Sequence, residues 1–154
     1  MKDVLHFING EFVASKSGKT FDKIDPATGE VIAKVASGDV CEVDAAVAAA
    51  KTAFETWGKL PQVERSRLLM ELAAAINRRA AEFVAAEVAD TGKPMSLAGH
   101  LDIPRGAANF VQFAEHFKYI ATECWENQVQ TALNYAVRRP VGVVAVISPW
   151  NLPL

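Results

Sequence analysis

The pattern of apolar and polar positions predicts short strands near the N-terminus. Apolar residues at 7–8 and 11–13 flank Asn9-Gly10, which is the pattern of a β-hairpin with a two-residue turn. A turn marked by Pro26 and Gly29 then precedes a run of strand-forming residues at 31–35. The chain is therefore expected to begin with small, turn-punctuated β structure.

The period becomes helical from residue 39 onward. Asp39 and Glu42 have the three-residue spacing of a capping box, in which each side chain accepts a hydrogen bond from the backbone of the other residue. Gly58 is placed to end this first helix. Its predicted apolar stripe has helical spacing and consists of Val43, Val47, Ala50, Phe54 and Trp57.

Further helices are predicted between residues 61 and 117. Pro61 suits the first turn of a second helix, and Gly92 followed by Pro94 ends the pattern. Ile103-Pro104 predicts another break, because the residue before a proline avoids helical backbone. The expected buried faces are Leu68, Leu69, Leu72, Ala73 and Ile76, and then Phe110, Phe113 and Phe117 beside Ala107.

The last part of the chain predicts two strands. A short strand is expected at 133–137, after the polar stretch at 126–128. Residues 141–147 form an apolar run without polar alternation, which is typical of a strand buried on both faces of a parallel sheet. Such a strand needs neighbours on both sides, and the sequence after it supplies none. The chain is therefore interpreted as an α/β domain that is cut off part-way.

Several segments resemble the aldehyde dehydrogenase superfamily. The most specific is Pro149-Trp150-Asn151, directly after the apolar run. Within the superfamily, the chain is most similar to the 2-hydroxymuconic and 2-aminomuconic semialdehyde dehydrogenases. The resemblance covers nearly the whole chain, and its other segments are residues 7–12, 25–30, 90–94, 102–110, 134–140 and 140–143.

The resemblance implies an α/β fold, namely the N-terminal part of an aldehyde dehydrogenase. Residues 1–132 would be the N-terminal part of the NAD(P)-binding domain, and 133–139 would be an oligomerisation-type strand. Residues 140–154 would begin a parallel strand of the cofactor domain. Family members are much longer, so their catalytic cysteine and general-base glutamate would lie beyond residue 154. A homo-oligomer is implied for the full-length protein.

Charge and composition narrow the classes of partner. The net charge is −2 and no block of like charges occurs, which argues against nucleic acid or an anionic membrane as the main partner. No apolar run has the length of a transmembrane helix, and no secretory leader is visible. Two cysteines are too few for a disulfide framework, so a reducing, cytoplasmic setting is expected.

Asn151 is the candidate catalytic residue. The resemblance implies that a cysteine thiolate attacks the aldehyde carbon and that a side-chain amide stabilises the resulting oxyanion. An asparagine suits this role, because its amide donates hydrogen bonds and stays neutral. From composition alone, the preferred interpretation is that Asn151 caps a helix or makes a turn before Pro153.

The cofactor candidates are the four residues before Asn151. The resemblance implies that Ile147, Ser148, Pro149 and Trp150 lie against NAD, with NADP possible, largely through backbone and apolar contacts. The Gly-x-Gly-x-x-Gly fingerprint and the P-loop are both absent from the sequence. The residues themselves show only a strand end with a rigid proline, and ordinary packing of Trp150 is the alternative.

Arg105 is the candidate for substrate recognition. A muconic semialdehyde carries a carboxylate at the end opposite its aldehyde, and a guanidinium can bind a carboxylate through two parallel hydrogen bonds. The alternatives are an ion pair between Arg105 and Asp102, or a solvated surface arginine.

The remaining reactive side chains give weaker signals. Cys41 and Cys124 do not match the nucleophile of the family and are interpreted as structural, and the three histidines lack metal-ligand spacing, so no metal site is predicted. The carboxylates Glu64, Glu71, Glu82 and Glu87 are interpreted as solvated helix faces.

The combined interpretation is the N-terminal portion of an NAD-dependent dehydrogenase that oxidises a muconic semialdehyde to the dicarboxylic acid in aromatic meta-cleavage catabolism. The complete enzyme would capture a small aldehyde as a thiohemiacetal, pass a hydride to NAD and release an acid. The 154 residues alone are expected to be inactive. The alternatives are another aldehyde dehydrogenase, of the succinic or betaine aldehyde type, and a non-catalytic fragment or interaction module.

Overall fold

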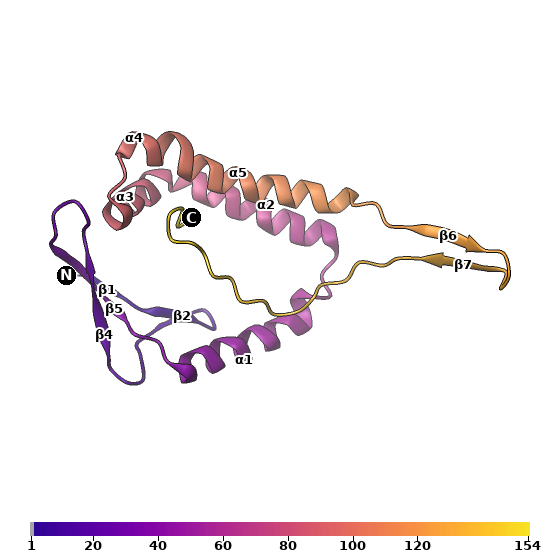
Figure 1. The fold of residues 1–154 in the computed structure, drawn as a ribbon, viewed down its shortest axis with the longest axis horizontal. Coiled ribbons are helices and arrows are strands. Elements are labelled where there is room, and N and C mark those ends of the chain that lie inside the picture. Colours follow the sequence, from indigo (N-terminus) through magenta and orange to yellow (C-terminus); the bar gives the residue numbers. More distant parts are fainter. Residues whose placement is uncertain (1) are drawn as a thin grey trace.

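A computed structural model describes residues 2–154 of the chain. Two short β regions flank a group of helices (Figure 1). The strands are β1 (Lys2–Val4), β2 (His6–Ile8), β3 (Glu11–Val13), β4 (Thr20–Ile24), β5 (Val31–Ala36), β6 (Cys124–Asn127) and β7 (Ala132–Tyr135). The helices are α1 (Val40–Trp57), α2 (Gln62–Arg78), α3 (Ala80–Thr91), α4 (Met95–Leu97), the π-helical turn η1 (Ala98–Asp102), α5 (Ile103–His116) and the 3₁₀ turn η2 (Phe117–Tyr119).

The N-terminal strands form two small sheets. Strand β5 lies between β1, to which it is parallel, and β4, to which it is antiparallel. Strands β2 and β3 form the predicted hairpin, in which Asn9 (φ 54°) and Gly10 (φ 85°) supply the two left-handed residues of the turn. The predicted strand at 31–35 is also confirmed, and it extends to Ala36.

Helix α1 begins and ends where the sequence indicates. The Asp39–Glu42 capping box is present, and the backbone N–H of Asp39 donates to Glu42 Oε2 at 2.8 Å. Gly58 follows the last residue of the helix. The apolar stripe of α1 is largely uncovered within residues 2–154, since Val43 and Trp57 are both exposed.

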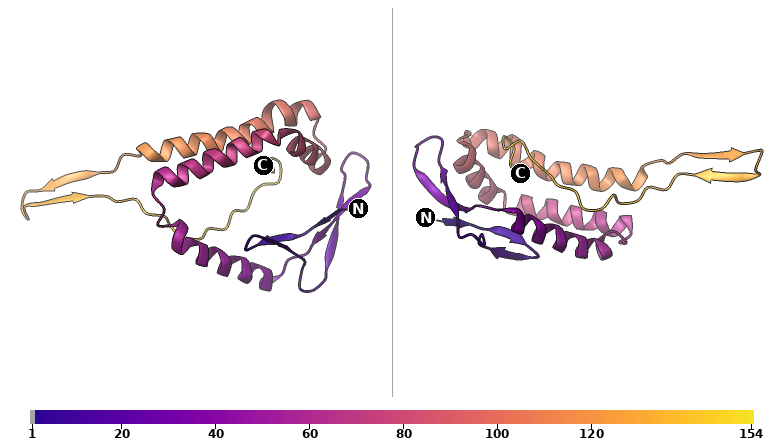
Figure 2. Two further views of the ribbon diagram at one scale, coloured as in Figure 1. Left: turned by 180° about the vertical axis from the view of Figure 1, so that it is seen from behind. Right: turned by 60° about the horizontal axis from the view of Figure 1, so that its bottom comes forward.

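The main helical core lies between α2 and α5, which run side by side (Figures 1 and 2). Ile76 of α2 packs with Ile103 and Ala107 of α5, and the partly buried Phe83 and Phe110 cover this cluster. The core is small because alanines supply much of it. It includes Ile103, the first residue of α5, and so lies next to the candidate site.

Three predictions about the helices are wrong. Ile103-Pro104 does not break the chain, since η1 runs directly into α5 with Ile103 in helical backbone (φ −65°, ψ −47°). Pro104 directly follows the π-helical turn, so its missing N–H removes a hydrogen bond to a carbonyl of η1. Burial of the Ile103 side chain offsets this loss and the reluctance of Ile103 to be helical. Phe113 is not on the buried face of α5 but is 65% exposed, and Leu72 of α2 is exposed as well.

The chain leaves the helices as a projecting β-hairpin made of β6 and β7 (Figures 1 and 2). The strand expected at 133–137 is confirmed as β7, although it begins at Ala132 and ends at Tyr135. Its partner β6 was not predicted, because its sequence Cys-Trp-Glu-Asn lacks apolar alternation. Leu133 and Tyr135 remain exposed on the hairpin.

The strand predicted at 141–147 does not form. Residues 136–154 contain no helix or strand, and Val141 and Ile147 are almost fully exposed rather than buried on both faces. A parallel strand takes its hydrogen bonds from neighbouring strands, and residues 2–154 place none beside this segment. The segment instead runs back toward the helices, so that the C-terminus lies near α3 and α5 (Figures 1 and 2).

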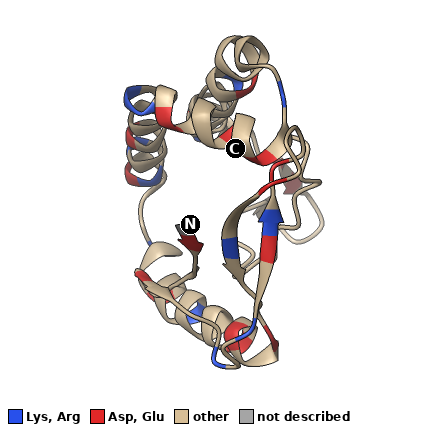
Figure 3. Ribbon diagram, turned by 90° about the vertical axis from the view of Figure 1, so that its left-hand side faces the viewer, with Lys and Arg blue, Asp and Glu red and all other residues tan. Residues whose placement is uncertain are grey.

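Charged residues of both signs are scattered over the helices and strands (Figure 3). No helix among residues 2–154 is both long enough and apolar enough to cross a membrane.

Candidate functional site

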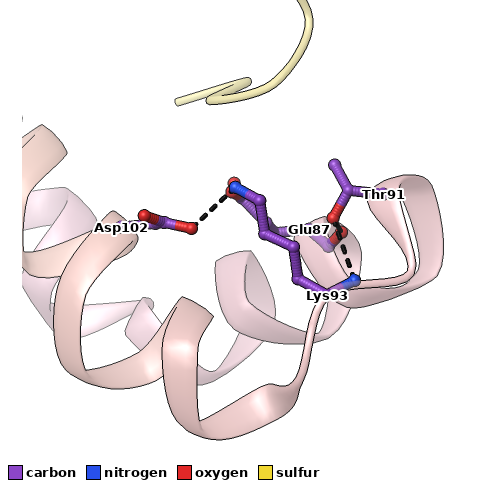
Figure 4. Close-up of polar contacts among 4 residues, drawn as sticks. All are labelled: Glu87, Thr91, Lys93 and Asp102. Carbon is purple, nitrogen blue, oxygen red and sulfur yellow. Dashed lines mark hydrogen bonds and ion pairs between the residues drawn. The ribbon is translucent and has the colours of Figure 1, made fainter.

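A buried cluster of three charged side chains lies where α3, η1 and α5 meet. Lys93 Nζ is 2.8 Å from Glu87 Oε1 and 2.7 Å from Asp102 Oδ2, so one ammonium group joins two carboxylates (Figure 4). The side chains of Lys93, Glu87 and Asp102 are 18%, 3% and 6% exposed. The interpretation of Glu87 as part of a solvated helix face is therefore wrong.

Local sequence explains how Lys93 reaches back over α3. Gly92 adopts a left-handed conformation (φ 72°), and its N–H donates to the carbonyl of Val88, which ends the helix. A Cβ at this position would also lie 2.9 Å from Pro26 Cγ. Thr91 Oγ1 donates to the carbonyl of Glu87 at 2.7 Å and accepts a hydrogen bond from the Lys93 N–H at 3.3 Å. The turn thus directs Lys93 toward both carboxylates.

Pairing is what makes this buried cluster stable. Hydrogen bonds to Asp102 and then to Glu87 raise the pKa of Lys93, although its partial burial acts in the opposite direction. An isolated charge in such a place would be costly, whereas a hydrogen-bonded ion pair offsets the loss of solvation. The cluster contains two negative charges and one positive charge, which leaves one negative charge in excess.

The first hollow of the candidate site lies beside this cluster and contains Arg105. Its lining includes Glu87, Asp102, Gly106 and Asn109, and it is closed by Leu152 and Leu154 of the C-terminal segment. That segment passes over the cluster (Figure 4), and a Cβ on Gly106 would lie 2.9 Å from Leu154 Cδ2. Within residues 2–154 the exposed Arg105 makes no ion pair, because Asp102 binds Lys93 instead. The proposed ion pair between Arg105 and Asp102 is therefore excluded in this structure.

The second hollow contains Asn151. Trp150 and Asn151 line it together with Pro26, Thr91 and Lys93. Lys93 also binds Glu87 and Asp102, which line the first hollow. The backbone N–H of Asn151 donates to the carbonyl of Pro149 at 2.7 Å, and Trp150 is left-handed (φ 54°). Asn151 therefore sits in a tight turn and caps no helix, and its side chain is exposed to the hollow.

Comparison with known proteins identifies the family of this chain. The sequence pattern described as "Aldehyde dehydrogenase family" matches residues 12–154. The 2-hydroxymuconic semialdehyde dehydrogenase of Pseudomonas sp. (strain CF600) is 55% identical over all of this chain and 32% of its own length. The 2-aminomuconic semialdehyde dehydrogenase of Danio rerio is 45% identical over 97% of this chain and 30% of its own length.

A solved structure agrees with these sequences. The indole-3-acetaldehyde dehydrogenase of P. syringae, solved in complex with NAD⁺, superposes with a TM-score of 0.91 at 38% identity. The superposition covers 96% of this chain and 30% of that one. The chain belongs to the aldehyde dehydrogenase family. It spans about a third of the length of the curated relatives that it matches, and its fold is the N-terminal part of an aldehyde dehydrogenase.

The four residues predicted to contact the cofactor lie together on the C-terminal segment. In this aldehyde dehydrogenase chain, Ile147, Ser148, Pro149 and Trp150 are all exposed on the segment that leads to Asn151. Ile147 and Trp150 offer apolar surface that suits the planar rings of NAD. Residues 147–150 contain no basic side chain for its phosphates, so they fit the ring contacts only.

The two cysteines of this aldehyde dehydrogenase chain are both exposed, so neither packs in the core as a structural residue would. The Cys41 thiol donates a hydrogen bond to Glu42 Oε2 at 3.1 Å, which raises the pKa of that thiol and opposes thiolate formation. No group of three potential metal ligands occurs in the described part of the chain.

Sequence reasoning missed the central role of Lys93 and Glu87. Glu87 occupies a position at helical spacing from the half-buried Phe83 and Val84, so it falls on the apolar face of α3. A carboxylate on an apolar face needs a buried partner. The lysine in the turn after Gly92 was the available partner, and this combination was the signal that could have revealed the cluster.

Proposed function

We propose that this chain is the N-terminal third of an NAD-dependent dehydrogenase that oxidises a 2-hydroxy- or 2-aminomuconic semialdehyde to the corresponding dicarboxylic acid. The observation that carries the proposal is the 55% identity, over the whole chain, to a 2-hydroxymuconic semialdehyde dehydrogenase. The identity to a 2-aminomuconic enzyme of a distant organism, 45%, supports the same class of substrate.

Asn151 is proposed as the oxyanion donor. Its side-chain amide lies in an open hollow at the end of the segment that resembles the Pro-Trp-Asn motif. An amide N–H directed at the aldehyde oxygen stabilises that oxygen more strongly once it carries negative charge, which lowers the barrier to nucleophilic attack. The tight turn between Pro149 and Asn151 restricts the backbone and so helps to hold the amide in place.

Arg105 is proposed to bind the carboxylate at the far end of the substrate. Its guanidinium lines the first hollow, and both nearby carboxylates are engaged by Lys93. An unpaired guanidinium can form two parallel hydrogen bonds with a carboxylate, which fixes both the position and the direction of a semialdehyde.

NAD is proposed as the hydride acceptor, with NADP also possible, and the exposed apolar surface of Ile147 and Trp150 would contact its rings. When bound, the cofactor supplies the oxidising chemistry. The exposed β6–β7 hairpin, with Leu133 and Tyr135 on it, is proposed to join subunits of a homo-oligomer.

The substrate assignment is tested by Arg105→Ala in the full-length enzyme, meaning these residues together with the remaining two thirds that the relatives possess. Steady-state kinetics would compare a semialdehyde bearing a distal carboxylate with an uncharged aldehyde of similar length. A charge-assisted hydrogen bond is worth about 1.5–3 kcal/mol, so KM for the carboxylated substrate should rise about 10- to 100-fold. The uncharged aldehyde never makes this contact, and its KM should hardly change.

Arg78→Ala is the matched control, because Arg78 is also an exposed arginine but lies at the end of α2 and lines neither of the two hollows. It should leave both substrates unaffected. If Arg105→Ala raises KM equally for both substrates, or for neither of them, Arg105 does not bind the carboxylate. Another class of aldehyde then becomes the better assignment.

A further inference from the structure

We infer that Lys93 is a positioning residue for substrate recognition, because it neutralises the two carboxylates that would otherwise pair with Arg105. This inference rests on the proposed function of Arg105. It explains why the Arg105 guanidinium stays free to bind a substrate carboxylate.

The geometry brings both carboxylates to the wall of the hollow that contains Arg105. Glu87 comes from α3 and Asp102 from the end of η1, and both line the first hollow. Asp102 lies three residues before Arg105, a spacing at which oppositely charged side chains on a helix meet. Without another cation, Asp102 would therefore be the natural partner of Arg105.

Lys93 prevents that pairing by binding both carboxylates at once. Its Nζ lies 2.7 Å from Asp102 Oδ2 and 2.8 Å from Glu87 Oε1. Because both carboxylates are almost completely buried, they cannot turn outward to exchange this partner for water. The cluster therefore keeps its shape whether or not a ligand occupies the hollow.

The charges explain why the remaining guanidinium attracts an anion. Glu87, Lys93, Asp102 and Arg105 together carry two negative and two positive charges, so a substrate carboxylate adds an anion to a neutral group. If Lys93 were neutral, two carboxylates would face one guanidinium. Arg105 would then be drawn into an internal ion pair, and a substrate carboxylate would have to displace a carboxylate that is already in place.

The backbone around Lys93 holds it in this role. Gly92 turns the chain back through its left-handed conformation, the Lys93 N–H donates to Thr91 Oγ1, and Pro94 restricts the backbone of Lys93, the residue before it. Lys93 also borders the hollow that contains Asn151. The same side chain thus lines the hollow that contains Asn151 and binds two carboxylates in the wall of the hollow that contains Arg105.

The first arm of the test is Lys93→Met in the full-length enzyme. An arginine engaged in a charge-assisted pair must give it up before it binds substrate, so KM for a carboxylated semialdehyde should rise about tenfold. The effect on kcat should be smaller, and the KM of an uncharged aldehyde should stay within about twofold. Lys93→Arg keeps the positive charge and should largely restore the original KM. Equal losses on both substrates would show a merely structural role and overturn the inference.

Because Lys93→Met leaves two buried carboxylates without their partner and could unfold the site, a second variant is needed. Glu87→Gln, Lys93→Met and Asp102→Asn combined remove all three charges, so Arg105 has no internal competitor. KM for the carboxylated substrate should then return to near that of the unmodified enzyme. A KM that stays as high as in Lys93→Met would contradict the competition.

A crystal structure of the Lys93→Met enzyme tests the pairing step independently of substrate. Arg105 should lie within about 4 Å of an Asp102 or Glu87 carboxylate oxygen, the usual limit for an ion pair. If Arg105 stays apart from both, the inference fails even if Arg105 does bind the substrate carboxylate. If Arg105→Ala changes KM equally for both substrates, the proposed function of Arg105 fails. If the Lys93→Met structure still shows the new ion pair of Arg105, the inference about pairing stands.

Discussion

The hydroxyl of Ser66 in α2 donates a hydrogen bond of 2.8 Å to the backbone carbonyl of Ala114 in α5, and both residues are buried. This bond joins the two helices of the main core at the end opposite the charged cluster. It lies outside both hollows, so its removal changes stability without touching the proposed chemistry.

Ser66→Ala should destabilise the pairing of α2 and α5 by about 1–3 kcal/mol, because the carbonyl of Ala114 would stay buried without this donor. Amide hydrogen exchange of α2 and α5 in the full-length enzyme measures the loss. Thr52→Ala is the control, because the Thr52 hydroxyl also donates to a backbone carbonyl, that of Ala48, but at the exposed surface of α1. Equal protection in the Ser66 variant and the unmodified enzyme would show that the bond contributes nothing.

The start of α1 should depend on pH through Glu42. Its carboxylate accepts backbone hydrogen bonds from Lys16 and Asp39, which lower the pKa of Glu42 from its ordinary value of 4.5 to about 2. Because the pKa of Glu42 is lower in the folded chain than in the unfolded chain, the ionised carboxylate stabilises the fold at pH values above 4.5. This stabilisation is lost as the pH falls from about 4.5 to about 2.

Glu42→Gln should therefore weaken the first turn of α1 at neutral pH, and its difference from the unmodified chain should shrink as the pH falls through that range. Hydrogen exchange of the amides in this turn, followed at several pH values, measures the effect. Glu55→Gln on the exposed face of α1 is the control and should change little. A difference that stays constant from neutral pH to pH 2 would refute the role of the ionised carboxylate.

Asn151→Ala in the full-length enzyme should lower turnover by roughly 10²–10³-fold, the usual loss when one oxyanion donor is removed. Binding of the cofactor should change little, since the amide is directed at the substrate oxygen. Asn77→Ala, at an exposed position of α2, is the matched control. Near-normal turnover, with the chemical step shown to be rate-limiting, would reject the assignment.

The isolated 154-residue chain should be catalytically inert. Its two cysteines do not match the nucleophile of the family, and the pKa of Cys41 is raised rather than lowered. An oxyanion donor alone cannot start acyl chemistry. Reduction of NAD⁺ by the purified chain in the presence of aldehyde, above the rate of a boiled sample, would disprove this expectation.

The isolated chain should also associate in solution. The stripe of α1 leaves Val43 exposed, and Phe12, Phe113 and Ile147 are exposed elsewhere. Large apolar surfaces that face water favour self-association. Sedimentation velocity measures the size of the species, and near-UV circular dichroism follows thermal unfolding. A sharp monomer that melts cooperatively would argue against this prediction.

The sequence predicted the features that depend on a few neighbouring residues. The Asn9-Gly10 hairpin and the Asp39–Glu42 capping box both formed, because the conformation of a turn or a helix start is set within four or five residues. Phe113 was misplaced because the buried stripe of α5 runs through Ala107 and Ala114, and the position just before Ala114 falls outside that stripe despite its aromatic side chain.

The charged cluster could not be predicted in the same way. Glu87, Lys93 and Asp102 meet only because the left-handed Gly92 and the η1 turn bring α3 against the start of α5. The prediction of a strand at 141–147 was wrong for a different reason. Its composition indicates a buried environment, but the strands that would create that environment are not among residues 2–154.

The π-helical turn η1, from Ala98 to Asp102, affects where relatives of this chain are expected to differ in length. The buried apolar side chains along this helix are at positions 98, 103, 107 and 114, and the first step of five residues is one longer than an α-helical turn. A π-helical turn accommodates one residue more than an α-helical turn, and here the apolar inner face continues through it. Removing one residue from this turn would restore the ordinary pitch and leave Ile103 facing the same neighbours. Length differences between relatives are therefore expected to occur inside this helix. A sequence alignment that places gaps only in loops would then misalign Arg105, which follows the turn.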